Sequence, residues 1–281
     1  RADWNAIRKQ FADKKLAILK DITGANYLAA MTLLVTYKNS LVNNGAVTCK
    51  KRDILRLELA DYKANHDALI SGFESSAAFL SQQGIYSERD LPYSSQLVPL
   101  AAIFAYDSEL KENRHLMLSQ NLELLAKWYW CGVFGELYGG ANEARFALDI
   151  ANIFDWINNG SQPDTVTRSN FQPTRLLSMQ TRNSAAYKGV MAMIMQDSPL
   201  DFMSGNKMDI ASYLDEDTDI HHIFPQAYCE GAKLPIRKWN SVVNKTPIYA
   251  STNRSIGGRA PSEYIKTMKN KGLSDEQVVS A

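Results

Sequence analysis

The chain has 281 residues, of which 45% are hydrophobic and 22% charged, and 31 Lys and Arg against 30 Asp and Glu leave a net charge of +1. This is the composition of a globular protein of one to three domains, and it excludes disorder, collagen and a coiled-coil rod. The longest apolar runs, residues 28–37 and 97–106, are shorter than the roughly 20 residues that span a bilayer.

A helical period dominates the chain from Trp4 to about Met203. Apolar residues recur three and four positions apart there, which is typical of helices with one buried face. Turn sequences such as Asn158-Asn159-Gly160 separate the helical segments. Only residues 46–49 are briefly strand-like. We expect helices over residues 4–19, 27–37, 54–59, 66–73, 75–80, 98–106, 116–137, 141–157 and 185–195.

An aromatic cluster lies in the middle of this region, at Trp128, Tyr129, Trp130, Phe134 and Tyr138. Aromatic faces can stack on unpaired nucleobases, so a binding platform is one interpretation. Three of the five residues are spaced four apart, however, which is the spacing of a buried helical face. Packing in the core is therefore the preferred interpretation.

The cysteines, Cys49, Cys131 and Cys229, are odd in number and have no close pairing, which fits a reducing compartment, and we expect a cytoplasmic protein. The chain begins with Arg and has no leader sequence, so we expect it to be a fragment of a longer protein. A net charge near zero argues against a nucleic-acid partner, because phosphate neutralisation by Lys and Arg drives such binding.

The charge is unevenly distributed after Met203. Residues 201–220 carry six acidic residues and one Lys, a net charge of −5, and residues 232–271 carry nine basic residues and one Glu, a net charge of +8. The neutral average therefore conceals a basic terminal module. We expect a mainly α fold in which a multi-helix domain, residues 1–204, is followed by a small α+β domain, residues 205–281.

Two adjacent histidines, His221 and His222, mark the start of this terminal module, and Asn253 follows 32 residues after His221. That distance holds a strand, a loop, a second strand and the start of a helix. Pro225 is expected to end the first strand, since proline lacks the ladder N–H. Residues 246–249 are a plausible partner strand. Thr252 is a candidate N-cap, and a further helix is expected to begin at residue 261, where a proline is tolerated.

This arrangement resembles the ββα-metal finger of HNH nucleases. More closely, it resembles the C-terminal nuclease domain of GmrSD-type modification-dependent restriction proteins, in which a His-His-Ile-hydrophobic-Pro run is followed by an Asn, by Thr-Asn-Arg and by Pro-Ser-Glu-Tyr. Residues 91–100 and 127–130 are similar to the helical middle region of those proteins. Their N-terminal Asp-Gly-Gln-Gln-Arg motif, associated with nucleotide hydrolysis, is absent, so we expect the C-terminal half of such a protein.

The resemblance implies a role for each matching residue. His222 matches the general base, His221 and Asn253 match the metal ligands, and Asn244 matches the residue that orients the catalytic loop. The pattern is His-His, Asn, Asn and departs from a literal His-Asn-His. The implied activity is a DNA endonuclease that depends on Mg²⁺ or Mn²⁺, in an anti-phage restriction system. The implied partners are phage or modified DNA and a nucleotide-hydrolysing N-terminal domain, with a homodimer as a further expectation.

The chemistry of phosphodiester hydrolysis supports this assignment independently. Neutral imidazole, with a pKa of about 6.5, suits proton abstraction from water at neutral pH, and a dication stabilises charge on the phosphate. One His and one Asn carry no negative charge, so the metal should bind weakly until substrate completes its shell. Neighbouring residues on a strand face opposite ways, so only His221 is expected on the ion. Asp219 lies two residues before His221, so its side chain is expected on the same face of the strand, where it could orient that ligand.

Alternatives remain at the level of the sequence. Cys229 near the histidines could indicate structural zinc, but the spacing matches none of the usual zinc patterns. Lys245, Arg254 and Arg259 are the expected phosphate contacts, with an ordinary solvated face as the alternative. The chain could instead be a non-catalytic module that binds DNA and docks the N-terminal domain. Activity on RNA is a third possibility.

Overall fold

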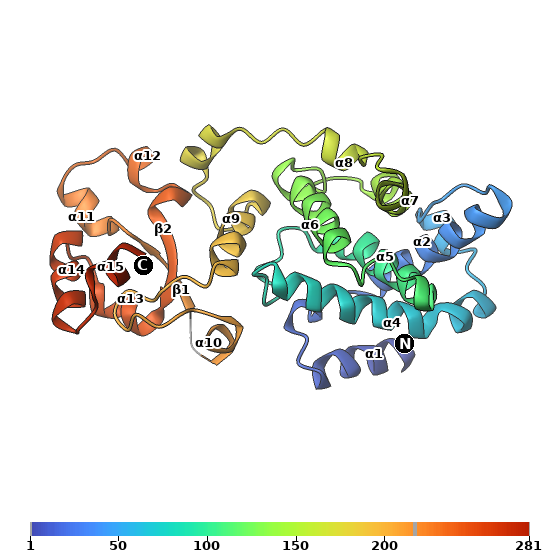
Figure 1. Ribbon diagram of the computed structural model, residues 1–281, viewed down its shortest axis with the longest axis horizontal. Helices are drawn as coiled ribbons and strands as arrows, with labels where there is room; N and C mark the ends of the chain where they lie inside the picture. The colour runs from blue at the N-terminus through green and yellow to red at the C-terminus, as the bar shows by residue number, and fades with distance from the viewer. Residues whose placement is uncertain (1, 216–217, 281) are drawn as a thin grey trace. The chain divides into compact units, whose positions relative to one another are not determined.

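The structure, a computed structural model, describes residues 2–215 and 218–280, and it forms two compact units (Figure 1). The first unit comprises the residues up to Leu80 together with residues 87–170. The second comprises residues 81–86 together with those from Phe171 onward. Each unit is mainly helical, so the mainly α fold class is confirmed. None of the helices that the structure describes is long and apolar enough to cross a membrane.

Residues 171–204, which precede the expected boundary, belong to the second unit and form hydrogen bonds with the rest of it. The backbone carbonyl of Met179 accepts a bond of 2.7 Å from the amide of Val242. The carbonyl of Gln180 accepts one of 3.0 Å from Lys245 Nζ. The expected boundary near residue 205 follows from the distribution of charge, which carries no information about such contacts. In the structure the longer segment of the second unit begins at Phe171 instead.

All regular elements between residues 2 and 170 are helices, and most of the expected helical windows contain one. Residues 66–73 and 75–80 lie in a single helix, whereas residues 54–59 span the gap between two helices. Residues 46–49 form no strand, since Thr48 bonds to Thr36 on a helix through its amide and its carbonyl (3.1 and 2.8 Å). The α-helices are α1 (Ala2–Asp13), α2 (Gly24–Asn43), α3 (Lys51–Ile54), α4 (Leu59–Gln82), α5 (Leu97–Glu109), α6 (Ser119–Phe134), α7 (Glu143–Asn159) and α8 (Asp164–Thr167), and the 3₁₀ helices are η1 (Ala17–Leu19), η2 (Ser94–Gln96) and η3 (Lys111–Asn113).

Helix α5 forms the centre of the first unit. Its residues from Leu97 to Ala105 are all buried, which is the property of a helix enclosed on every side. Helices α2 and α7 both pack against it. Helix α4 approaches α5 closely at Gly72, where an added Cβ would lie 2.3 Å from the backbone oxygen of Ala101 and 2.9 Å from the amide nitrogen of Ala105. The lack of a side chain at Gly72 therefore sets how closely the two helices pack.

Replacing Gly72 with Val is expected to destabilise the protein by about 3 kcal/mol, near the upper end of the usual cost of overpacking. The clash is with backbone atoms of α5, which cannot move aside as a flexible side chain can. Urea unfolding measures the change. Gly45→Ala is the control, because a Cβ at Gly45 meets no atom within 4 Å. A Gly72→Val variant as stable as this control would refute the close packing.

The aromatic cluster is part of the core of the first unit. Trp128 and Tyr129 are 0% and 1% exposed, and Trp130 stacks on Phe134 with 5.8 Å between ring centroids. Tyr138, which lies beyond the end of α6, is also buried and donates its hydroxyl to Asp149. The interpretation of this cluster as core packing is confirmed.

The second unit contains the two strands of the described chain, β1 (Thr218–His222) and β2 (Lys245–Tyr249), which pair antiparallel. Helix α13 follows β2 directly and contacts both strands (Figure 1). The remaining elements are the 3₁₀ helices η4 (Pro173–Ser178) and η5 (Val242–Asn244) and the helices α9 (Ala185–Gln196), α10 (Ile210–Asp215), α11 (Gln226–Gly231), α12 (Ile236–Trp239), α13 (Ala250–Ile256), α14 (Pro261–Asn270) and α15 (Asp275–Ser280).

Two expected boundaries in this unit are wrong. Strand β1 ends at His222, and Pro225 is the N-cap of α11. The N-cap of α13 is Tyr249, so Thr252 lies inside that helix, where its hydroxyl donates to Asp201. The expected helix start at Pro261 is confirmed by α14.

Candidate active site

The register of the two strands sets the positions of the histidines. His221 lies opposite Thr246, and His222 lies opposite Lys245. Because side chains alternate along a strand, the two rings belong to opposite faces of this small sheet. Their partners differ accordingly: His221 contacts Asn253 on α13, and His222 contacts Asn240 in the segment after α12.

On the first face, three side chains form a hydrogen-bonded chain. His221 Nδ1 lies 2.8 Å from Asn253 Oδ1, and Asn253 Nδ2 donates to Asp219 Oδ2 at 3.0 Å. An ionised carboxylate only accepts hydrogen bonds, so Asp219 fixes the amide of Asn253 with its oxygen toward His221. The sequence-predicted metal ligands and Asp219 are therefore adjacent, with Asn253 in the middle.

The other nitrogen of His221 faces an apolar environment. Nε2 is buried and has no hydrogen-bond partner, and the rings of Phe202 and Tyr264 lie 6.3 and 6.5 Å from the imidazole centroid. Burial lowers the pKa of His221, partly offset by its bond to Asn253. The ring is thus neutral near pH 7. With Asn253 Oδ1 as acceptor, Nδ1 holds the proton, and a metal at Nδ1 requires the opposite tautomer.

If a dication replaced the proton that His221 and Asn253 share, the separation of these two donors would already suit it. Two neighbouring ligands at about 2.0–2.1 Å from an octahedral Mg²⁺ lie about 2.9 Å apart, and the His221 nitrogen and Asn253 oxygen are separated by 2.8 Å. Asp219 adds a negative charge beside them. Within residues 2–215 and 218–280, however, no three His, Cys, Asp or Glu side chains converge on one point. The donors gathered on this face are therefore one imidazole nitrogen, one amide oxygen and one carboxylate.

On the second face, His222 is oriented by Asn240 and Trp239. Its Nε2 lies 3.1 Å from Asn240 Oδ1, and its ring meets the Trp239 ring edge-on at 5.6 Å. With this oxygen as acceptor, Nε2 donates and Nδ1 keeps the lone pair. Burial lowers the pKa of His222, the bond to Asn240 partly offsets this, and the positive charges of Lys245 and Arg182 lower the pKa further. A neutral imidazole with a free nitrogen is what a general base requires.

Asn244 holds the turn that follows β1. Its Oδ1 accepts a bond from the amide of Phe224 at 2.9 Å, and its Nδ2 donates to the carbonyls of Phe224 (3.1 Å) and Trp239 (2.8 Å). Its own carbonyl accepts from the amide of Ile223 at 2.8 Å. Asn244 thus connects the turn after His222 to the end of α12, and it does not itself contact the histidine rings through these bonds.

The three expected phosphate contacts differ in their availability. Lys245 is only 7% exposed, and its ammonium group donates to the Gln180 carbonyl. Arg259 bonds to the Ile256 carbonyl and the Thr267 hydroxyl, joining α13 to α14. Arg254 is exposed and is the one of the three that is open to a ligand.

Arg182 is a candidate that the sequence analysis missed. It is exposed, and its Nη2 donates to the backbone carbonyl of Ile220 at 2.9 Å, next to His221 in β1. Arg182 bonds to a backbone atom and lies 40 residues before His222, so no pattern of side chains in the sequence identifies it. Its remaining N–H groups are available to an anion.

Cys229 does not join the histidines. It is buried, and its thiol donates to the Phe224 carbonyl at 3.4 Å. Burial, together with the charge of Glu230, raises the pKa of this thiol. A protonated thiol is a poor zinc ligand, so Cys229 contributes to packing below the turn.

The chain is similar in sequence to a known protein. The chain is 35% identical over 169 residues to an uncharacterized protein of Methanocaldococcus jannaschii, an alignment that covers 57% of this chain. The chain spans 28% of the length of that relative. No known family profile matches the chain.

Proposed function

We propose that this chain is a metal-dependent DNA endonuclease whose β1–β2–α13 region is an HNH-type ββα-metal finger. The observation that supports the proposal is that the two histidines of β1 have separate hydrogen-bond partners on opposite faces of the sheet. His221, Asn253 and Asp219 form one linked donor group, whereas His222 on the other face is held separately by Asn240. A metal site beside an independent general base is the pairing that phosphodiester hydrolysis needs.

The proposed reaction begins with proton transfer from water to His222. The resulting hydroxide forms a bond to phosphorus while the bond from phosphorus to the 3′ oxygen breaks. The departing 3′ oxygen takes a proton from solvent water, which gives a 3′-hydroxyl and a 5′-phosphate, and His222 returns its proton to solvent. Asn240 holds the imidazole ring and Asn244 holds the turn behind it. A bound Mg²⁺ or Mn²⁺, carried by His221 and Asn253, supplies Lewis-acid stabilisation of charge on the phosphate.

Two exposed arginines are the proposed phosphate contacts. Arg254 follows Asn253 directly, and Arg182 is fixed at Ile220 by its backbone bond. Planar guanidinium groups bind phosphate oxygens through two parallel hydrogen bonds, which positions the substrate as well as neutralising it. The biological setting we propose is a cytoplasmic anti-phage restriction system, in which an N-terminal nucleotide-hydrolysing domain controls cleavage of phage or modified DNA.

Supercoiled plasmid tests the proposal directly. The chain is incubated with plasmid in Mg²⁺ or Mn²⁺ and, as a parallel sample, in excess chelator, and nicked and linear products are measured over time. Nicking that needs the metal supports the endonuclease. Nicking by the wild type that never exceeds that of His222→Ala, at any metal or protein concentration, overturns it.

A second candidate is a module that binds DNA without cutting it. The observation that favours it is the scarcity of anionic ligands: in the part of the chain that the structure describes, no group of three acidic, His or Cys side chains could hold an ion. Calorimetric metal titrations with and without DNA separate the candidates. A nuclease site takes up metal more tightly once DNA is present, whereas a basic binding face needs only low salt.

Arg182→Ala is expected to slow plasmid nicking by about tenfold to a hundredfold, because a charge-assisted bond to phosphate contributes about 1.5–3 kcal/mol. Arg182→Lys should recover only part of the loss, since an ammonium group cannot make the bidentate contact. Arg168→Ala, in the first unit, removes an equally exposed arginine and controls for net charge. Equal nicking by the Arg182 and Arg168 variants would remove Arg182 from the site.

A further inference from the structure

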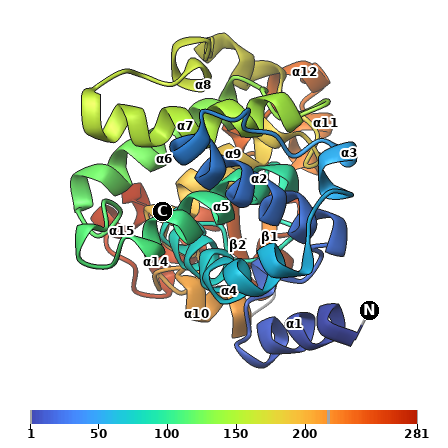
Figure 2. The same cartoon turned by 90° about the vertical axis from the view of Figure 1, so that its right-hand side faces the viewer.

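A pocket of about 880 Å³ lies in the first unit, beside α2, α7 and the segment that joins α2 to α3. Helix α2 contacts both α3 and α7 (Figure 2). Small-molecule sites in proteins measure about 300–1,000 Å³, so this volume suits a ligand of that class. The lining residues all lie within residues 32–61 and 143–151, so the pocket shares nothing with the candidate active site.

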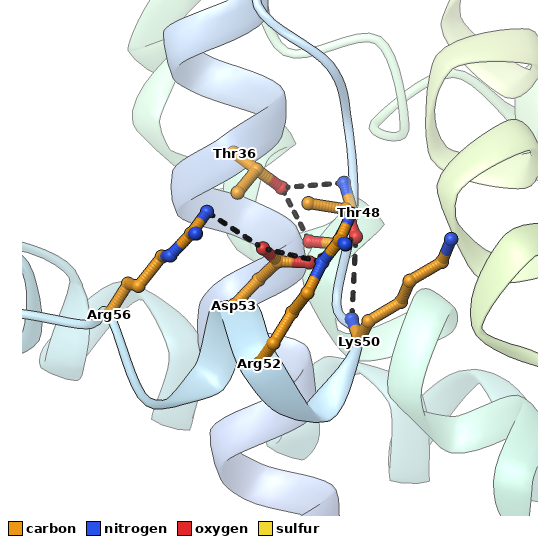
Figure 3. Close-up of polar contacts among 6 residues, drawn as sticks. All are labelled: Thr36, Thr48, Lys50, Arg52, Asp53 and Arg56. Carbon is orange, nitrogen blue, oxygen red and sulfur yellow. Dashed lines mark hydrogen bonds and ion pairs between the residues drawn. The ribbon is translucent and has the colours of Figure 1, made fainter.

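The pocket lining includes two arginines that pair with one carboxylate. Arg52 Nε and Arg56 Nη1 lie 3.7 and 3.5 Å from the same oxygen of Asp53 (Figure 3). The Asp53 side chain is 9% exposed, whereas those of Arg52 and Arg56 are 74% and 77% exposed. A buried carboxylate thus anchors two cations whose other N–H groups face the solvent.

The anchor is itself held in place. Asp53 Oδ2 accepts a bond from the Thr48 hydroxyl at 2.8 Å. The hydroxyl of Thr36, on α2, donates to the Thr48 carbonyl at 2.8 Å and accepts from its amide at 3.1 Å (Figure 3). These bonds order the anchor before any ligand arrives, which reduces the entropy lost on binding.

Another part of the pocket lining is an uncovered face of α7. It consists of Ala144, Ala147, Leu148 and Ala151, spaced three and four residues apart, and Leu148 is 51% exposed. The rest of α7 packs into the core through residues such as Ile150. Small side chains leave a smooth apolar surface on which a flat ring can lie.

Acidic groups limit the kind of anion that fits. Asp53 is neutralised by its two arginines, Asp61 accepts a bond from the Glu58 amide, and Glu143 is exposed at the start of α7. A nucleic-acid backbone running through the pocket would place phosphates beside Asp61 and Glu143. A ligand with one anionic end and hydrogen-bond donors elsewhere meets no such repulsion.

We propose that this pocket binds a nucleotide. Its phosphate lies between Arg52 and Arg56, its base lies against the alanine face of α7, and its amino or hydroxyl donors face Glu143. The arginine pair supplies the planar, charge-assisted bonds that phosphate oxygens accept, and the apolar wall adds the area that inorganic phosphate cannot bury. This site is independent of the proposed cleavage chemistry.

Calorimetry on the full chain tests the proposal with the four ribonucleoside 5′-monophosphates, the matching nucleosides, inorganic phosphate and a single-stranded oligothymidylate as probes. At least one monophosphate should bind with a Kd below about 1 mM, that is, more favourably than about −4 kcal/mol. Its nucleoside and inorganic phosphate should each bind at least tenfold more weakly. The binding assay needs no nuclease activity.

Two kinds of variant locate the site. Arg52→Gln with Arg56→Gln removes the charges at exposed positions, and Ala147→Phe fills the apolar wall while leaving every charge in place; each should weaken binding at least tenfold. Arg8→Ala with Lys9→Ala, on the exposed face of α1, removes two charges elsewhere and should bind as the wild type does. The proposal is overturned if no monophosphate saturates, if the control pair weakens binding equally, or if the oligonucleotide binds and the monophosphates do not.

Discussion

His222→Ala is expected to reduce plasmid nicking by about 10²–10⁴-fold, the range of a general base, at every metal concentration. In the proposed mechanism the imidazole takes the proton of the attacking water, and no dication replaces that function. The bond to Asn240 and the edge contact with Trp239 hold the ring on the face away from His221. Removing the ring therefore leaves the proposed metal donors intact.

His221→Ala and Asn253→Ala should behave differently from His222→Ala. Each removes one donor of the proposed metal site, so nicking falls but is partly restored as Mn²⁺ is raised. The measurement is the nicking rate of all three variants across a metal titration. If high metal restores His222→Ala as fully as His221→Ala, the two histidines do not have the separate roles proposed for them.

The Asn240→Ala variant tests whether Asn240 only orients the His222 ring or takes part in the reaction itself. Asn240 contacts the His222 ring and has no chemical step of its own in the proposed mechanism, so its loss should slow nicking by about tenfold, well short of the loss of the base itself. Thermal unfolding of each variant shows whether the second unit remains folded. A drop as large as that of His222→Ala in a folded protein would give Asn240 a direct part in the reaction.

Helical periodicity predicted most helices of the first unit correctly. It failed where apolar residues are exposed or where polar residues are buried. The predicted helix over residues 54–59 assumes that its apolar residues are buried, yet Leu55 and Leu59 are 81% and 68% exposed. The predicted break inside α4 arises from polar residues near Glu74. Ser76 there is fully buried and donates to the Gly72 carbonyl at 2.7 Å, so the helix continues.

The candidate site was predictable where its residues follow one another through β1, β2 and α13. His221 and Asn253 are brought together by strand pairing and by the direct passage from β2 into α13, and His222 follows on the opposite face of β1; all of this depends on local sequence. Asn240 and Arg182 were not predictable from pattern. Arg182 bonds to a backbone carbonyl, which every residue possesses, and only the folded chain brings it beside the strand.

Asp201 anchors the region that carries Asn253, although it takes no part in the proposed chemistry. It is 0% exposed. Its Oδ1 accepts from the Tyr249 amide at 3.1 Å, and its Oδ2 accepts from the Thr252 hydroxyl at 2.8 Å. The same oxygen also accepts from the amides of Met203 and Ser204. One carboxylate thus ties the turn at Met203 and Ser204, which precedes α10, to the junction of β2 and α13.

Asp201→Ala is therefore expected to destabilise the second unit by about 3–5 kcal/mol, because several buried donors lose their acceptor together and each orphaned donor costs about 1–3 kcal/mol. Hydrogen exchange measures the effect: amides of β2 and α13 should exchange at least about a hundredfold faster, since each 1.4 kcal/mol is a factor of ten. Asp197→Ala, at an exposed position in the same unit, should leave these rates nearly unchanged. Equal protection of β2 and α13 in the two variants would show that the Asp201 bonds do not hold α13 in place.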